Sequence, residues 1–412
     1  MRMQVSDRKG NVSVFLAMAF VSLVLVVSVM VRASAMVCLE ASSNLLLQQS
    51  GRYVLSEFHM GLKDYYGIIA FKGDESMMES RMRFYMEESF KGKGKSGNFS
   101  VIKPRLEEIL CLGKGYCLIE KSVFLDAVEE AVIHKLPFKG KGKGRWEESQ
   151  GELRNEKIRL SLPSKKISCS KGVLQGLLVK ITGLGNLTEL DEKGIILDYY
   201  IEDYFNCNKE NRSRCPTFFQ NEMEYVLYGE YGDDKNKGDF LRDFVAVRLA
   251  LNSIHLYQDR EKQEEIMVLA EVLTPLDPFP TAILITEGWA LAESINDKKL
   301  LDEGKKVALY KKPENWAISL SSIEDIVLSF TEDDRKGKGI PPRDEKGMDY
   351  KDYLKLFLKF MDIDTKAYRT MDLIQLNIQG NMDPQFYMEE CHVGFLYRAV
   401  INGVEYEYIQ KY

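Results

Sequence analysis

The sequence GNVSVFLAMAFVSLVLVVSVMV, residues 10–31, determines how the rest of this chain is organised, because its 22 positions contain no charged residue. A hydrocarbon core about 30 Å thick is spanned by roughly 20 apolar helical residues. A helix buried in a soluble protein seldom stays apolar on every face over such a length. We therefore predict a transmembrane helix over residues 11–33.

The charges that flank this segment predict its orientation. Arg2, Arg8 and Lys9 precede it, whereas Arg32 is the one basic residue that closely follows it. Basic residues favour the cytoplasmic side of a membrane. We therefore predict a cytoplasmic leader over residues 1–10 and a single-pass protein of the cell membrane whose C-terminal domain is extracytoplasmic.

A removable signal peptide is the main alternative to a permanent anchor. Ala33, Ser34 and Ala35 have the small side chains that signal peptidase recognises, and cleavage would leave Met36 as the new N-terminus. Against this, the apolar run exceeds the roughly 7–15 residues of a signal peptide, and Arg32 lies where a neutral cleavage region is expected. Cleavage between Ala35 and Met36 stays an alternative to an intact anchor.

The helical pattern continues beyond the predicted membrane span. Apolar residues recur mostly three to four positions apart without an intervening proline, at Val37, Leu45, Leu46, Tyr53, Leu55, Phe58, Leu62 and Tyr65. This periodicity is typical of a helix with one apolar face. We predict that the transmembrane helix extends as a stalk over residues 34–72.

Composition limits the classes of partner. The chain has 412 residues, of which 45% are hydrophobic and 29% charged, so it can form a sizeable core outside the anchor. Its net charge of -6 gives no concentrated basic face for nucleic acid. The basic runs at residues 91–95, 139–145 and 335–338 alternate lysine or arginine with glycine, which is typical of exposed loops.

The seven cysteines do not form a metal-binding pattern. None lies in a CxxC pair and no histidine completes a zinc site, so we expect no metal and no cofactor. Two close pairs, Cys111 with Cys117 and Cys207 with Cys215, are candidate disulfides if the compartment is oxidising. Free, buried thiols are the alternative for both pairs.

The remaining sequence predicts an α+β fold that is predominantly α. Residues 73–192 form a mixed region, in which 106–112 and 123–134 have helical spacing and 116–119 and 173–182 are apolar runs of buried strands or helices. Residues 193–412 predict a helical bundle that ends in a β-hairpin around Asn402-Gly403. The expected helices cover residues 195–205, 240–257, 261–273, 281–295, 350–361 and 365–378, with Gly238-Asp239 as the start of the second; residues 307–310 and 316–320 look extended.

No motif announces an enzyme. The chain lacks the HExxH, GxSxG and phosphate-binding GxxxxGK[ST] patterns. Glu287 and Glu293 beside Trp289 could be a carboxylate pair of a glycan hydrolase. Helical spacing instead favours Trp289 in the bundle core, Gly288 at a close helix approach, and glutamates that are solvated or paired with lysine or arginine. We therefore predict no catalytic residue.

Several segments, in this order, resemble one family. They are residues 9–15 (KGNVSVF), 55–58 (LSEF), 65–67 (YYG), 223–229 (MEYVLYG), 248–252 (RLALN), 289–294 (WALAES), 305–309 (KKVAL), Trp316, 350–354 (YKDYL) and 369–377 (RTMDLIQLN). The chain resembles membrane-anchored proteins of unknown function encoded in Tad-type (Flp) pilus loci of Clostridium-like Gram-positive bacteria.

The resemblance implies an accessory, pseudopilin-like component of a Tad-like pilus or secretion apparatus, with the lipid bilayer and other pilus or secretion components as partners. A pilin-type leader would be cut between Gly10 and Asn11, although Phe15 stands where pilins have a glutamate. The alternative functions are an anchored cell-wall or glycan hydrolase and a ligand-binding ectodomain.

Overall fold

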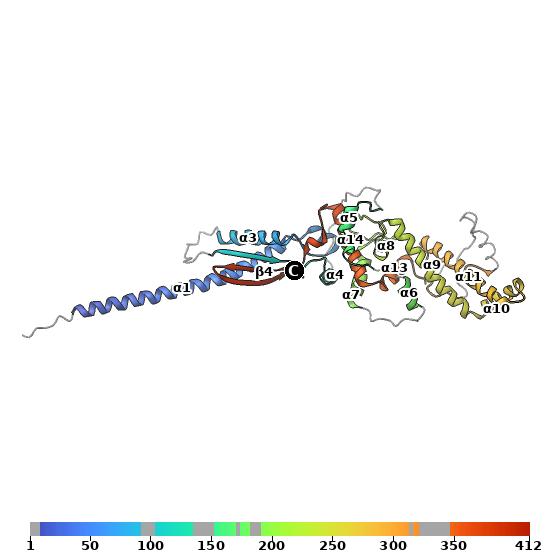
Figure 1. Ribbon diagram of the computed structural model, residues 1–412, viewed down its shortest axis with the longest axis horizontal. Coiled ribbons are helices and arrows are strands. Elements are labelled where there is room, and N and C mark those ends of the chain that lie inside the picture. The colour runs from blue at the N-terminus through green and yellow to red at the C-terminus, as the bar shows by residue number, and fades with distance from the viewer. Residues whose placement is uncertain are drawn as a thin grey trace, which may run out of the picture. The chain divides into compact units, whose positions relative to one another are not determined.

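The computed structural model describes residues 9–91, 104–134, 152–169, 174–181, 191–312, 316–320 and 347–412. It has an α+β fold that is predominantly helical, which confirms the predicted fold class (Figure 1). The chain forms two compact units. Unit 1 contains residues 1–59, 69–117 and 390–412, and unit 2 contains residues 60–68 and 118–389. Unit 1 therefore combines parts of the predicted stalk, mixed region and C-terminal hairpin.

Unit 1 is built around helix α1 (Lys9–Ser56), helix α3 (Glu75–Lys91) and a three-stranded antiparallel sheet. The sheet has the strand order β2 (Leu106–Leu112), β4 (Gly394–Ile401) and β5 (Val404–Lys411). Two short strands, β1 (Phe71–Lys72) and β3 (Cys391–His392), form a second antiparallel pair. The C-terminal hairpin thus pairs with a strand that is almost 300 residues earlier in the chain.

The long helix α1 confirms that the helix continues past Arg32, since it runs without interruption for 48 residues. It is shorter than the predicted stalk, which extended to residue 72. The helix ends at Ser56, and Phe58 forms an isolated antiparallel bridge with Phe71. The following helix, α2 (Met60–Tyr66), belongs to unit 2.

Strand β2 corrects the prediction of a helix over residues 106–112. It pairs with β4 from Leu106 opposite Ile401 to Leu112 opposite Leu396. Ile109 and Cys111 are buried while Leu110 and Leu112 are exposed, which is the two-residue alternation of a strand with one buried face. The apolar run at residues 116–119, which predicted a buried strand or helix core, lies in a bend and a turn, with Cys117 in an isolated antiparallel bridge to His392.

The terminal hairpin confirms the turn predicted at Asn402-Gly403. Both residues have positive φ, 50° for Asn402 and 77° for Gly403, as a two-residue hairpin turn requires. Asn402 also joins the hairpin to the chain before β2, because its side-chain oxygen accepts a hydrogen bond from Arg105 N at 2.8 Å.

Unit 2 is helical and contains the helices predicted from periodicity. Its longer elements are α4 (Lys121–His134), α7 (Glu192–Tyr204), α9 (Asp233–Gln258), α10 (Arg260–Leu273), α11 (Pro278–Asp302), α13 (Tyr350–Lys359) and α14 (Ile363–Asn381). Shorter helices are α5 (Glu156–Ser161), η1 (Pro163–Lys166), α6 (Leu174–Ile181) and α8 (Glu222–Tyr228). Figure 1 shows α9, α10 and α11 packed together.

Two helix boundaries in unit 2 differ from the prediction. Helix α9 begins at Asp233, so Gly238-Asp239 lies inside it and does not mark its start. Helix α11 begins at Pro278, because a proline in the first turn has no hydrogen bond to lose. Within residues 307–310, Val307 pairs with Met348 through two backbone hydrogen bonds of 2.9 Å.

Candidate functional site

Helix α1 has two parts with different surroundings. The large apolar side chains between Val12 and Val37 are exposed. From Ser43 onward one side of the helix is buried in unit 1, at Leu47, Ser50, Gly51, Val54 and Leu55. Among the described residues, α1 is the helix long and apolar enough to cross a membrane, so it is a candidate membrane span or signal sequence.

The buried part of α1 is attached to the sheet of unit 1 by tyrosine hydroxyls. Tyr397 OH donates to Leu47 O at 3.3 Å, and Tyr408 OH donates to Asn44 Oδ1 at 2.5 Å. Tyr412 OH donates to Leu55 O. These contacts are spread over about three turns of α1, from Asn44 to Leu55, so the buried part of the helix is held at several points.

Gly51 allows a close approach between α1 and the sheet. A Cβ at this position would lie 3.1 Å from both Cε1 and the hydroxyl oxygen of Tyr397. Such a distance is shorter than ordinary van der Waals contact. Glycine therefore lets the ring of Tyr397 lie against the helix backbone, at the cost of lower helix propensity.

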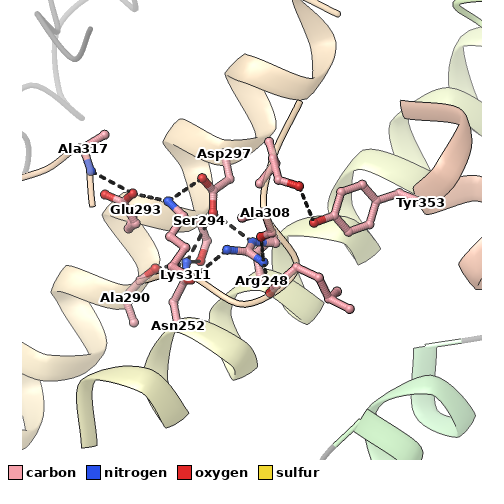
Figure 2. Close-up of polar contacts among 12 residues, drawn as sticks. Arg248, Asn252, Ala290, Glu293, Ser294, Asp297, Ala308, Lys311, Ala317 and Tyr353 are labelled. Carbon is pink, nitrogen blue, oxygen red and sulfur yellow. Dashed lines mark hydrogen bonds and ion pairs between the residues drawn. The ribbon is translucent and has the colours of Figure 1, made fainter. Parts of the chain in front are cut away.

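A buried ionic cluster lies between α9 and α11 in unit 2 (Figure 2). Arg248 Nε donates to Asp297 Oδ2 at 2.9 Å, and both side chains have no exposed surface. Arg248 Nη2 also donates to Asn252 Oδ1 at 3.0 Å, and Asn252 Nδ2 donates to Ser294 Oγ at 3.0 Å. The cluster therefore connects one face of α9 to the facing side of α11.

The same cluster holds the segment that follows α11. Arg248 Nη1 donates to the backbone oxygens of Ala308 and Leu309, at 2.9 and 2.7 Å. Lys311 Nζ contacts Glu293 Oε1 and lies 2.7 Å from Asp297 Oδ1. Two cations thus face two carboxylates in a region without solvent, which is the arrangement that compensates buried charge.

The structure does not bring together the candidate carboxylate pair beside Trp289. Glu287, Trp289 and Glu293 each contact different partners. Trp289 is 2% exposed and its Nε1 donates to Ile318 O at 2.8 Å, as predicted for a core residue. Glu293 pairs with Lys311 and accepts from Ile318 N at 3.0 Å. Glu287 accepts from Ser253 Oγ at 2.8 Å, so the two carboxylates do not converge on one substrate position.

The predicted close helix approach at Gly288 is not made within the described chain. A Cβ at Gly288 would meet no atom within 4 Å outside its own helix. The glycine lies on the side of α11 that faces away from the ionic cluster, with Leu284 and Leu291 exposed one turn before and after it. Among the described residues, no other element therefore packs closely on this face of α11 at Gly288.

Two buried glutamates of α8 have carboxyl groups with altered acidity. Burial raises the pKa of Glu222 to about 8 and that of Glu224 to about 7. Glu222 accepts from Asn377 Nδ2 at 2.7 Å, and Glu224 Oε1 accepts from Tyr350 OH at 2.8 Å. These hydrogen bonds join α8 to α14 and α13, so the glutamates are cross-links of unit 2.

All seven cysteines are free in the structure, including both candidate disulfide pairs. Burial raises the pKa of Cys111 to about 12, and those of Cys207 and Cys215 to about 11. Cys117 is also buried. Because their pKa values are raised, the thiols of Cys111, Cys207 and Cys215 stay protonated at neutral pH and are not reactive nucleophiles.

The candidate processing sites lie in helical backbone. Gly10 and Asn11 are in the first turn of α1, and Ala35 and Met36 are within the same helix. Within the described ranges, no group of three or more histidine, cysteine, aspartate or glutamate residues is placed to hold a metal ion.

Sequence reasoning missed the ionic cluster, although a signal for it exists. Arg248 and Asn252 are four residues apart on α9 and lie among its apolar residues, and Ser294 and Asp297 are three apart on α11. Polar residues at helical spacing on a buried face must find partners on a neighbouring element. The pattern could indicate a polar contact, but not which element supplies it.

A comparison with known proteins identifies the family of the chain. No curated protein and no solved structure matches the chain significantly. A family model described as a family of unknown function matches residues 144–403, which is more than half of the chain and includes the whole ionic cluster. The protein therefore belongs to this family of unknown function, DUF5702.

Proposed function

We propose that the protein is a single-pass, membrane-anchored and extracytoplasmic accessory component of a Tad-like pilus or secretion apparatus, similar to a pseudopilin, and that it acts through protein contacts. The observation that carries the proposal is the division of α1. Its apolar N-terminal part is exposed, whereas its C-terminal part is a core element of unit 1.

This division suits a protein that is partly in lipid. Exposed apolar side chains on every face of a helix are unfavourable in water and favourable in a bilayer. Because α1 is continuous, the lipid-facing part and the part packed on the sheet are one helix. The series of sequence segments that resemble proteins of Tad-type pilus loci supports the assignment to a pilus or secretion system.

We propose no catalytic role. Glu293 is charge-compensated by Lys311, and Glu287 is hydrogen-bonded to Ser253 and Tyr257. General acid–base catalysis needs carboxyl groups that reach a common substrate. The contacts of Glu287 and Glu293 therefore do not favour the glycan hydrolase as a second function.

The topology is tested with a membrane-impermeant maleimide on intact cells. Cys38 is exposed on α1 just beyond the apolar segment, so it should be labelled from outside. Cys38→Ser supplies the background from the other thiols. In that background, Ser6→Cys in the leader should be labelled only after the cells are permeabilised. Labelling of Ser6→Cys, but not of Cys38, in intact cells would refute the proposed orientation.

The role in assembly is tested by deleting the gene and counting surface fibres by electron microscopy. We expect fewer or shorter fibres, restored by the full-length protein. A matched form in which residues 1–35 are replaced by a cleavable signal peptide should not restore them, because it lacks the membrane-spanning part. Normal fibres in the deletion strain would contradict the pilus role while leaving the topology result intact.

A further inference from the structure

The hairpin formed by α10 and α11 ends in an unusually apolar and exposed surface. We define this hairpin tip as residues 268–284. Its exposed side chains include Val268, Val272, Leu273, Leu276, Phe279 and Leu284, of which Val272 and Leu284 are 72% and 74% exposed and Leu276 is fully exposed. Single exposed apolar residues are common, but several on one short hairpin tip are typical of an interaction surface.

The hairpin tip has a defined backbone conformation. The Thr274 hydroxyl lies 2.8 Å from Thr281 Oγ1, which links the end of α10 to the first turn of α11. Pro275, Pro278 and Pro280 restrict the backbone between them. A loop that is already ordered loses less conformational entropy when a partner binds.

Charge around the tip restricts the partner. The tip contains two acidic residues, Glu271 and Asp277, and no lysine or arginine. The nearest basic residues on α10 are Arg260, which pairs with Glu264, and Lys262. Lys262 is engaged with the protein itself, since its Nζ lies 4.7 Å from the ring centroid of Trp289 and 5.0 Å from that of Trp316. The acidic Glu265, Glu271 and Asp277 are exposed. The tip therefore combines apolar side chains with a negative rim.

We propose that the hairpin tip docks a partner protein through an amphipathic helix whose apolar face is flanked by lysine or arginine. The apolar side chains of the partner cover Leu276, Phe279 and Leu284, and its basic residues face Glu271 and Asp277. The open surface at Gly288, between Leu284 and Leu291, continues the apolar face along α11 and leaves space for a helix to approach closely.

Two other occupants are disfavoured by the same charges. In a symmetric pair of tips from two copies of this chain, equivalent negative rims would face each other and repel. An anionic lipid surface would also repel the rim, since membrane-binding segments are basic. A basic amphipathic helix is the partner that both the apolar surface and the charge favour.

This proposal rests on the proposed function, because it names the surface through which the protein would make its contacts with other proteins. Its test does not use membrane orientation or fibre formation, so the two can fail separately. The probes are two helical peptides of matched design, one of leucine and lysine and one of leucine and glutamate. Binding is measured by fluorescence anisotropy with the full chain in phosphatidylcholine nanodiscs, and empty nanodiscs give the background.

We expect the leucine–lysine peptide to bind and the leucine–glutamate peptide not to bind. Leu276→Asp should weaken binding of the lysine peptide by roughly tenfold or more, because a central interface anchor is lost. Leu160→Asp is the matched control, since Leu160 is an exposed leucine on α5 outside the tip. Both substitutions add one negative charge, so non-specific attraction of a cationic peptide would strengthen in both.

A charge exchange tests the rim independently of the apolar surface. The variant Glu271→Lys with Asp277→Lys should lose the lysine peptide and gain the glutamate peptide. The proposal is overturned if both peptides bind wild type equally, or if Leu276→Asp has no effect. It is also overturned if Leu276→Asp abolishes self-association in sedimentation, or if the tip inserts into phosphatidylglycerol vesicles, because the occupant is then a second copy or a membrane.

Discussion

Arg248 and Asp297 form a buried ion pair between the middle of α9 and the C-terminal part of α11, with 2.9 Å between Arg248 Nε and Asp297 Oδ2. The pair is one half of a cluster in which Lys311 and Glu293 supply the second cation and the second carboxylate. Because Arg248 also binds the backbone at residues 308 and 309, the cluster fixes the path of the chain after α11 as well as the packing of two helices.

Removing one member of this cluster should be strongly destabilising. We expect Asp297→Ala to lower the free energy of unfolding by about 3–5 kcal/mol, because it leaves Arg248 and Lys311 buried with one carboxylate between them. The measurement is urea unfolding followed by circular dichroism. Asp239→Ala is the control, since its partner Arg242 is largely exposed and such a pair contributes roughly 1 kcal/mol or less. Equal effects of the two substitutions would contradict the assigned role.

Glu224 should make the stability of unit 2 depend on pH. Its pKa is about 7 in the folded protein and near the ordinary value of 4.5 when unfolded. Between these values the folded state holds a proton that the unfolded state has released. The free energy of unfolding therefore falls as pH rises from about 4.5 to about 7, and this contribution levels off above that.

The variant Glu224→Gln isolates this effect. Glu224 Oε1 accepts from Tyr350 OH and Asn208 N, and a glutamine oxygen can accept both bonds. Its Oε2 is buried without a hydrogen-bond partner among the described residues, which suits a neutral group. We expect the variant to become more stable relative to wild type as pH rises from 5 to 7. The difference between their free energies of unfolding should change by at most about 1.4 kcal/mol per pH unit. A difference that does not change with pH would refute the raised pKa.

Alanine should be tolerated less well at Gly403, in the hairpin turn, than at Gly238, inside helix α9. Gly403 has a φ of 77°, and a Cβ there would meet no atom within 4 Å, so the effect of Gly403→Ala is conformational. We expect the free energy of unfolding to fall by roughly 1–2 kcal/mol, because a left-handed backbone conformation is unfavourable for alanine. Gly238→Ala in α9 is the matched control with equally open space, and it should stabilise by roughly 0.5–1 kcal/mol. Thermal unfolding of both variants gives the comparison.

The contact between Gly51 and Tyr397 should control how firmly α1 is held on its sheet. Gly51→Leu places a side chain where only 3.1 Å separates a Cβ from the tyrosine ring, so the ring or the helix must move. We expect faster proteolysis of α1 in the full-length protein, measured by limited digestion and mass spectrometry. Arg52→Leu introduces the same side chain at the exposed neighbouring position and should change proteolysis little. Unchanged digestion of both variants would show that the close approach is not important for attachment.

The elements that sequence predicted well are those whose signals are local. The apolar stretch of α1, the periodic helices of unit 2 and the Asn402-Gly403 turn depend on residues within a few positions of each other. The sequence predicts a helix at strand β2 because its apolar residues also fit a helical spacing over so short a run. Its two-residue alternation is decisive only once β4 is known to lie beside it.

By itself, the sequence determined that the chain begins with a long apolar helix, that helices dominate the rest and that a β-hairpin closes it, since backbone preference and hydrophobic periodicity are properties of short segments. Tertiary structure decided which distant segments meet: β2 with β4, the tyrosines of the hairpin with α1, and Arg248 with Asp297. Those pairings depend on burial and charge compensation between elements far apart in the chain, and a one-dimensional pattern does not specify them.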